Sequence, residues 1–318
     1  MYFPYIRGRQ YELLALKELL ANNLMSEKVI PVLEPVKLSP TLIHAVATFI
    51  GANRKLAIIR NPSVGSFMSD YVNAKSESKE YTYRERFDAA FDTPYIIKSV
   101  IINDDSHQLL NYWDENGVKR EELLVVANNH DYLNLYETYF DGTSPQYALI
   151  PDESAFRRKI RRHRVRLDDK FKKQDRNSDY EETRDEFFSD DHIFFAEDGF
   201  DGFADYSIVG DDYSEKGFAP YAVAIHIVYF DKDNYLRIKH FVSDSNDDIR
   251  NPALKFYEAV SKLAEWYRSD YPHIPLTLGL RTLLEHYDNQ TYPGLGTVKK
   301  LSLMHHLELM SKFLDEGN

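Results

Sequence analysis

Carboxylates, amides and cations stand directly after several short apolar runs of this sequence. They follow the runs singly or in small groups: Glu34, Arg60-Asn61, "NDD" at 103–105, "NNH" at 128–130 and "DDK" at 168–170. Carboxylate oxygens suit a hard cation such as Mg²⁺, and Arg and Lys suit phosphate oxygens. If the runs are parallel strands, their carboxyl ends share one edge of the sheet. The pattern then predicts metal-assisted phosphoryl chemistry at that edge.

Most of these groups can be given a role in such a reaction. The predicted ligands for Mg²⁺ or Mn²⁺ are three carboxylates: Glu34, Asp168 and Asp205. The predicted binders of substrate phosphate are Arg60, Asn61 and Lys170. The predicted catalytic acids and bases are Glu34, His226 and His240. Structural alternatives stand beside these roles, because a buried Glu can be half of a salt bridge and a strand histidine can be a hydrogen-bonded core residue.

Composition argues against several other chemistries. The chain has no cysteine, which excludes disulfides, zinc–thiolate sites and cysteine nucleophiles. The adjacent His305 and His306 point to different sides of a predicted helix, a poor geometry for joint metal binding. The net charge of −12 opposes extended duplex nucleic acid but leaves a short or single-stranded substrate open. No apolar run reaches the length of a membrane span and no signal peptide is visible, so we expect a cytoplasmic protein with no membrane partner.

The elements that must position these groups alternate along the chain. Six short apolar runs precede residue 170 and are separated by helical patterns: 29–33, 55–61, 95–102, 122–129, 146–151 and 164–167. Such alternation is typical of parallel βαβ units, and continuous apolar strands are typical of a sheet buried on both faces. Segments 204–210 and 221–230 can supply two further strands. We therefore expect a TIM-type (β/α)8 barrel; the rival is a doubly wound open sheet, which a glycine-rich loop after the first strand would have favoured.

The C-terminal half adds elements to this barrel. "YAVAIHIVYF-DKDN-YLRIKHFV" predicts a long β-hairpin, and extra helices are expected within about residues 251–318. A charged insertion is expected at about 157–200, where a basic stretch (157–176) is followed by an acidic one. The two stretches can neutralise each other as a solvated surface, or the basic one can form a phosphate-binding rim. The whole of residues 1–318 is treated as a single domain.

The stretch "EDGFDGFADYSIVGDD" combines acids, glycines and aromatics. Its aspartates lack the alternate spacing and the closing Glu of a calcium loop. Gly199 and Gly202 predict turns that lead into a strand. If that strand runs from residue 204 to 210, Asp205 begins it and Asp211 follows its carboxyl end. The direction of this strand therefore decides which aspartate faces the barrel mouth.

The opening "MYFPYIRGRQYELLALKEL" and the following "VIPVLEPV" resemble the beta-protein family of phage and bacterial genomes. The matching residues are Pro4, Arg9, Gln10, Glu12, Ala15, Leu16, Pro31 and Glu34. "GFADYSIVGDDYSEKGFAPYAVAIHIVYF" and "LRIKHFVSDSNDD" look like one bacterial subgroup. The resemblance implies a barrel-like α/β fold and a phage-defence or mobile-element setting, but no particular reaction. It adds Arg9 to the candidate substrate-binding residues, although residues 7–9 read Arg-Gly-Arg where many members have Lys.

Two functions remain open at this point. The first is a metal-assisted hydrolase of phosphodiesters, acting on nucleic acid or a nucleotide; it requires the candidate carboxylates to converge at one barrel mouth. The second is a non-catalytic binding component of a two-gene defence or toxin–antitoxin-like system. Its aromatic and charged surface would then dock a protein encoded by a neighbouring gene.

Overall fold

The computed structural model describes residues 1–214, 220–269 and 274–317. Contacts within these residues group the chain into two compact units, a finer division than the single domain expected above. Unit 1 comprises residues 1–13, 27–169 and 194–206, and unit 2 comprises residues 14–26, 170–193 and 207–318. Parts of the predicted C-terminal helical region, residues 270–273 and 318, lie outside the described residues.

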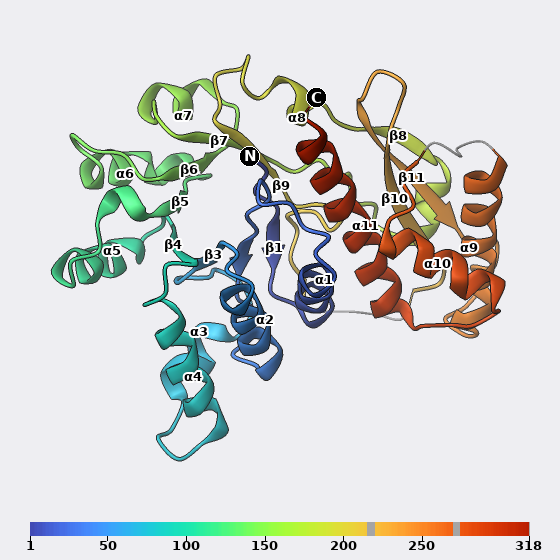
Figure 1. The fold of residues 1–318 in the computed structure, drawn as a ribbon, viewed down its shortest axis with the longest axis horizontal. Helices are drawn as coiled ribbons and strands as arrows, with labels where there is room; N and C mark the ends of the chain where they lie inside the picture. Colours follow the sequence, from blue (N-terminus) through green and yellow to red (C-terminus); the bar gives the residue numbers. More distant parts are fainter. Residues whose placement is uncertain (215–219, 270–273, 318) are drawn as a thin grey trace. The chain divides into compact units, whose positions relative to one another are not determined.

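Unit 1 is a parallel β-barrel. Within the described residues its sheet has eight strands (Figure 1): β1 (Tyr5–Arg7), β2 (Val32–Glu34), β3 (Leu56–Ile59), β4 (Ile96–Ile101), β5 (Leu124–Val126), β6 (Tyr147–Ile150), β7 (Arg164–Asp168) and β9 (Gly202–Asp205). All seven pairings in the order β1-β2-β3-β4-β5-β6-β7-β9 are parallel. The expected (β/α)8 architecture is confirmed, in place of the doubly wound alternative.

The residues before β1 close the barrel against β9. Phe3 N–H donates to the Phe203 carbonyl at 2.8 Å, and Phe203 N–H donates to the Met1 carbonyl at 3.1 Å. Tyr2 is the register partner of Phe203. The register can be followed from Tyr2 to its partner Phe203 on β9 and then from strand to strand back through β2. This circuit returns to the first strand at residue 10 instead of residue 2, so the barrel has a stagger of eight residues. Eight strands with this stagger are the geometry of a TIM barrel.

Two of the predicted barrel strands need correction. The six runs before residue 170 correspond to β2–β7, but the first strand is β1, whose three residues are too few to show a pattern. The eighth strand of the barrel is β9, which ends at Asp205 instead of starting there. The run 221–230 is not a barrel strand: its described strand, β10 (Ala224–Phe230), pairs with β11 (Leu236–Val242) as the hairpin that the same sequence predicted.

Helices cover the barrel strands in unit 1 (Figure 1). They are α2 (Pro40–Gly51), α3 (Phe67–Asn73), α4 (Lys79–Ala90), α5 (Ser106–Glu115), α6 (Leu133–Tyr139) and α7 (Ser154–Lys159), with 3-10 turns η1 (Arg120–Glu122) and η2 (His130–Tyr132). Ser39 caps α2 as predicted, because its Oγ accepts the Leu42 N–H at 3.2 Å and Pro40 occupies the first helical position. Two of the boundaries between the units fall inside α1 (Gln10–Ala21) and α8 (Asp191–Phe194).

The interior of the barrel is filled by alternate side chains of the strands. One buried cluster contains Tyr5, Val32, Ile59, Leu167, Ala204 and further residues from every barrel strand. Successive strand residues point to opposite faces, so the neighbours of these residues face the outer helices. The barrel is thus a packed core, and open space for a ligand must lie at its ends or elsewhere.

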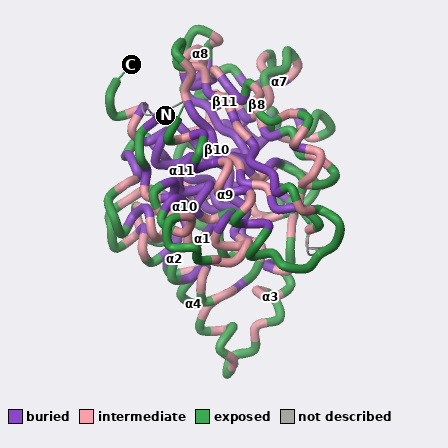
Figure 2. The backbone as a smooth tube through the Cα atoms, turned by 90° about the vertical axis from the view of Figure 1, so that its right-hand side faces the viewer, coloured by how far each residue is buried: buried purple, intermediate pink, exposed green. Residues whose placement is uncertain are grey.

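Unit 2 is built on a three-stranded antiparallel sheet in the order β10-β11-β8, where β8 is Asp185–Ser189. Its helices are α9 (Pro252–Ser269), α10 (Leu278–Asp288) and α11 (Leu295–Glu316), and η3 (Asn177–Glu181) precedes β8. Figure 2 shows β10, β11 and α11 as largely buried backbone. None of the helices in the described ranges has the length and hydropathy of a membrane span.

Two adjacent histidines of α11 join the elements of unit 2. The His305 Nε2 lies 2.7 Å from the Val228 carbonyl of β10, and its Nδ1 lies 2.7 Å from the Thr277 hydroxyl that caps α10. The His306 Nδ1 lies 2.8 Å from the Ser207 hydroxyl. Burial lowers the pKa of His305 to about 4 and that of His306 to about 3. Both are therefore neutral residues of the core of unit 2.

Barrel closure predicts the effect of a single methyl group at Gly202. A Cβ there would lie 2.8 Å from the Met1 carbonyl and 3.0 Å from the Phe3 ring. Gly202→Ala must push the closing segment off β9, and we expect a loss of about 1–3 kcal/mol in the free energy of unfolding. Guanidinium denaturation measures this loss.

The matched control is Gly51→Ala, at the end of α2. Apart from its chain neighbours and the backbone of its own helix, no atom lies within 4 Å of the added Cβ there, and helix propensity favours alanine. We expect this variant to be as stable as the parent or slightly more stable. Equal stabilities for both variants would contradict the close packing of residues 1–3 against Gly202 of β9.

Candidate functional site

Glu34 lies at the barrel mouth, completely buried and fully hydrogen-bonded. One carboxylate oxygen accepts the Ser63 N–H at 2.7 Å and the Ser63 hydroxyl at 2.8 Å. The other accepts the Tyr5 hydroxyl at 2.7 Å and forms a buried ion pair with Arg7. Burial and the Glu34 charge raise the pKa of Tyr5 well above its ordinary value, so Tyr5 stays a donor. The carboxylate ties β1, β2 and the loop after β3 together, which is the salt-bridge alternative considered for this residue.

The three predicted metal ligands do not meet in unit 1. Asp168 and Asp205 are opposite each other in the backbone register, at the carboxyl ends of β7 and β9. Leu167 and Ala204, the residues before them, line the barrel interior. By strand alternation both aspartates therefore face outward, and the Asp205 carboxylate accepts the Tyr2 hydroxyl at 2.8 Å. Glu34 follows Leu33 and shares the inward face of Val32, so it points the other way.

Among residues 1–214, 220–269 and 274–317, no group of three or more acidic or histidine side chains is arranged to hold a metal ion. The strand direction answers the question about the two aspartates, because Asp205 is the one that lies at the carboxyl end of β9. Asp211 belongs to unit 2.

The predicted phosphate binders have structural contacts. The Arg60 guanidinium lies 4.1 Å from the centre of the Tyr71 ring and 3.3 Å from the Asp88 carboxylate. The Asn61 side chain bonds both backbone groups of Ile101 on β4, at 2.8 and 2.9 Å. These contacts anchor loops at the barrel mouth.

The remaining two candidates lie elsewhere. Lys170 belongs to unit 2 and pairs with Asp191 at 2.9 Å. Arg9 precedes α1 and is half-buried. The structure therefore does not gather the four predicted phosphate binders within one unit.

Two of the predicted catalytic residues, His226 and His240, do meet, in unit 2. They are direct partners in the β10–β11 pairing, and their Nδ1 atoms are 2.7 Å apart. The Nε2 of His240 faces the Glu186 carboxylate of β8 at 3.4 Å. Lys172 pairs with the second oxygen of Glu186 at 2.7 Å. A chain of polar contacts thus runs from His226 through His240 to a carboxylate.

The proton positions in this chain follow from hydrogen-bond bookkeeping. Glu186 can only accept, so the Nε2 of His240 carries the proton that points to it. A neutral His240 then has a bare Nδ1, which must accept a proton from the Nδ1 of His226. His226 is left with a lone pair on Nε2, for which the described residues provide no hydrogen-bond partner. This arrangement gives His226 the tautomer of a general base.

Aromatic rings enclose the histidine pair. The Phe171 and Tyr180 ring centres lie 5.2 and 4.6 Å from that of His226. Burial, then His240 and Lys299, lower the pKa of His226 well below its ordinary value. Burial also lowers the pKa of His240, although Glu186 opposes this shift. Both rings are neutral at physiological pH, as the proton assignment requires.

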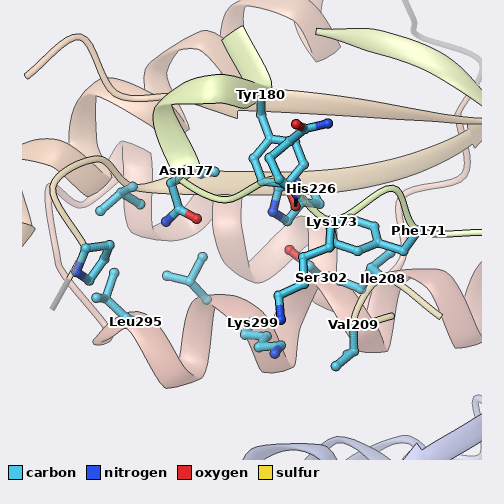
Figure 3. A pocket seen from close by; sticks show the side chains of 15 residues that line it. Phe171, Lys173, Asn177, Tyr180, Ile208, Val209, His226, Leu295, Lys299 and Ser302 are labelled. Atoms are coloured by element: carbon cyan, nitrogen blue, oxygen red, sulfur yellow. Dashed lines mark hydrogen bonds between the residues drawn. The ribbon is translucent and has the colours of Figure 1, made fainter. Parts of the chain in front are cut away.

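His226 lines a pocket of about 250 Å³ that lies within unit 2 (Figure 3). The segment before η3 contributes Lys173 from one side, and α11 contributes Lys299 from the other. Asn177 and Ser302 add polar groups, and several apolar side chains complete the wall. Lys173 also pairs with Asp212 at 2.6 Å in an exposed position. The pocket therefore combines a base, two cations and apolar surface.

Sequence reasoning named His226 and His240 but missed their partnership with Glu186. The predicted four-residue turn 231–234 would place Lys239 opposite His226. The loop actually has five residues, because Phe230 pairs with Leu236 and Asn234 adopts a left-handed φ of 62°. This one-residue difference sets His240 opposite His226. Lys173 and Asn177 had no recognisable signal, since they lie in an irregular segment.

Comparison with protein-family models, with curated proteins and with solved structures found no match for this chain. The fold nevertheless defines a class: unit 1 is a (β/α)8 barrel, and the chain continues from it into a second, antiparallel unit. The resemblance to the beta-protein family stays a prediction. The site must be interpreted from its own geometry.

The contacts of Glu34 predict a stability effect. Glu34→Gln removes the negative charge that Glu34 places beside the buried Arg7 guanidinium, and breaking a buried ion pair from one side costs about 3–5 kcal/mol. We expect the midpoint of guanidinium denaturation to fall accordingly. Asp288→Asn removes one partner of the exposed Arg268–Asp288 pair and should change stability by less than about 1 kcal/mol. Equal, small effects of both variants would show that Glu34 does not hold the mouth together.

Proposed function

We propose that this protein is a hydrolase of phosphate esters, with nucleotide or nucleic-acid phosphodiesters as the substrate class and His226 as its general base. The observation that supports the proposal is the pocket-lining His226, held through Nδ1 by a second histidine that itself faces a carboxylate. A base oriented by a partner that is in turn oriented by an acid is a recurring arrangement in hydrolases.

The chemistry starts at the free lone pair of His226 Nε2. This atom takes a proton from a water molecule as the water oxygen attacks the phosphorus atom. The bond from phosphorus to the leaving oxygen breaks, and the imidazolium of His226 returns the proton to that oxygen. Between these steps His240, itself held by Glu186, keeps the His226 ring in place and in the tautomer that the reaction needs. Each turnover therefore consumes one water and restores the neutral pair.

The other groups of the pocket favour an anionic substrate. Lys173 and Lys299 lie where they can offset the negative charge of a phosphate, and that charge rises during the attack. Asn177 and Ser302 can donate hydrogen bonds to phosphate oxygens. The volume lies just below the usual range for small-molecule sites, which fits one phosphate with part of its organic substituent.

A specific observation supports the second candidate function, the non-catalytic binding component. At the barrel mouth, where the fold usually places its chemistry, Glu34, Arg60 and Asn61 are occupied by structural contacts. A barrel of this kind could act as a scaffold in a two-gene defence system. This function predicts a stable complex with a neighbouring gene product and no activity of the isolated chain.

The direct test is hydrolysis of bis(p-nitrophenyl) phosphate and of a panel of nucleotide and oligonucleotide phosphodiesters. We expect His226→Ala to lower kcat by about 10²–10⁴, the usual contribution of a general base. His286→Ala is the matched control, because His286 lies on α10 and, within the described part of the chain, its ring hydrogen-bonds only Thr291, at 2.7 Å. Full activity of His226→Ala would remove His226 from the mechanism. Absence of activity on the whole panel would favour the binding component.

The pH dependence tests the role of His240 as a positioning residue. Because the pKa of His226 is lowered, the base is unprotonated at neutral pH, and the acid limb of kcat/KM should lie below the ordinary histidine range. His240→Asn removes a group that lowers this pKa and that fixes the tautomer. We expect kcat to fall and the acid limb to move to higher pH. A fall in kcat with an unmoved limb would indicate a merely structural effect.

The predicted use of Mg²⁺ or Mn²⁺ is tested with the same assay. A reaction carried by His226 alone should keep most of its rate in the presence of EDTA. If activity instead appears only on adding Mg²⁺ or Mn²⁺, the metal-assisted mechanism is the correct one. Asp168→Asn and Asp205→Asn would then show whether the predicted ligands take part.

A further inference from the structure

Three arginines lie at the turn from α7 to β7 in unit 1 and are here called the arginine patch: Arg158, Arg161 and Arg162. All three are exposed. Across residues 1–214, 220–269 and 274–317, none of them forms an ion pair with a carboxylate.

The nearby carboxylates are already engaged by neighbouring cations. Arg157 pairs with Asp152 at 2.9 Å, and Lys159 pairs with Glu137. Arg166 pairs with Asp198 at 3.2 Å, and the His163 ring lies 3.6 Å from the Asp201 carboxylate. The basic and acidic stretches of the sequence thus neutralise each other in part, as one of the two interpretations expected. The arginine patch is what this neutralisation leaves over.

The turn that carries the arginine patch is fixed by its buried residues. Phe156 and Ile160 are buried on α7 and just after it, and Val165 is buried on β7. His163 adopts a left-handed φ of 55°, which reverses the chain within a few residues. The Arg161 side chain donates to the Arg158 carbonyl at 3.2 Å. A ligand would therefore meet arginines whose backbone is already ordered, which lowers the entropy cost of binding.

We propose that the arginine patch binds the phosphate backbone of a single-stranded nucleic acid. Guanidinium groups bind phosphate oxygens in a bidentate manner, and three of them can follow successive phosphates of a flexible strand. The acidic remainder of the chain repels a long rigid duplex more than a strand that can bend away. This binding does not depend on the proposed activity of the pocket in unit 2.

The described residues around the arginine patch expose no large apolar side chain, and this favours a polyanion over a protein or a membrane as the partner. Protein interfaces depend on buried aromatic or aliphatic anchors, and membrane-bound surfaces insert apolar side chains. Among the described residues from 113 to 186, no large apolar side chain is exposed. The arginine patch offers charge without such anchors, and charge alone supports binding to phosphates.

The experiment is fluorescence anisotropy of the full chain with labelled single-stranded DNA and RNA of about 20 nucleotides, against the matching duplex, over a series of salt concentrations. The test variant is Arg158→Ala/Arg161→Ala/Arg162→Ala. We expect it to bind single strands at least about tenfold more weakly and to lower the slope of log K against log salt by about two, since each lost phosphate contact contributes about 0.7.

The matched control removes the same charge from the same unit. Lys75, Lys79 and Arg86 are exposed and have no ion pair among the described residues, so Lys75→Ala/Lys79→Ala/Arg86→Ala should bind like the parent. An equal loss in both triple variants would show a general charge effect and overturn the proposal. Absence of salt-dependent binding by the parent, or tighter binding to an acidic peptide or to phosphatidylserine vesicles than to single strands, would also overturn it.

Discussion

The backbone hydrogen bonds between Phe203 and residues 1–3 close the sheet of unit 1, and the positions of the other barrel strands depend on them. A sheet left open at this point would expose two edges of unpaired amides and carbonyls. Closure also fixes the stagger of eight residues, which decides the side chains that point inward. The inward position of Glu34 and the outward positions of Asp168 and Asp205 are consequences of that register. Gly202 allows the closing segment to approach, because it places no side chain in the seam.

The barrel mouth and the histidine pocket show how differently the same residue types can be used. Glu34 accepts four hydrogen bonds, and its oxygens are committed to holding strands and a loop. His226 has the opposite character, since one nitrogen is fixed and the other has no partner among the described residues. A buried polar group with all its bonds made contributes order, whereas a group with one bond left over can act on a ligand. The hydrogen bonds that each side chain makes are therefore a better guide to the functional site than the location expected from the fold alone.

Much of the architecture could be predicted from the sequence, because apolar runs at βαβ spacing determine a barrel almost regardless of detail. Six of its strands and the capping of α2 follow from such patterns. The short strands were not predicted correctly: β1, with three residues, was missed, and the start of β9 was predicted two residues too late. The site depended on smaller differences still. The face on which a strand-end carboxylate lies requires the exact strand register, and the partner of His226 changes when a hairpin loop gains one residue.

The order of the two units along the chain has a consequence for synthesis. Unit 1 is complete only when residues 202–206 have left the ribosome, because β9 is the last strand to join the barrel. By then residues 170–193 have already emerged, including β8, but β11, the strand that pairs with β8, has not. The nascent chain must carry a single unpaired strand beside a barrel that is ready to close. The charges of β8, with Asp185 and Glu186 at its start, are well suited to keep such a waiting strand from pairing with another chain.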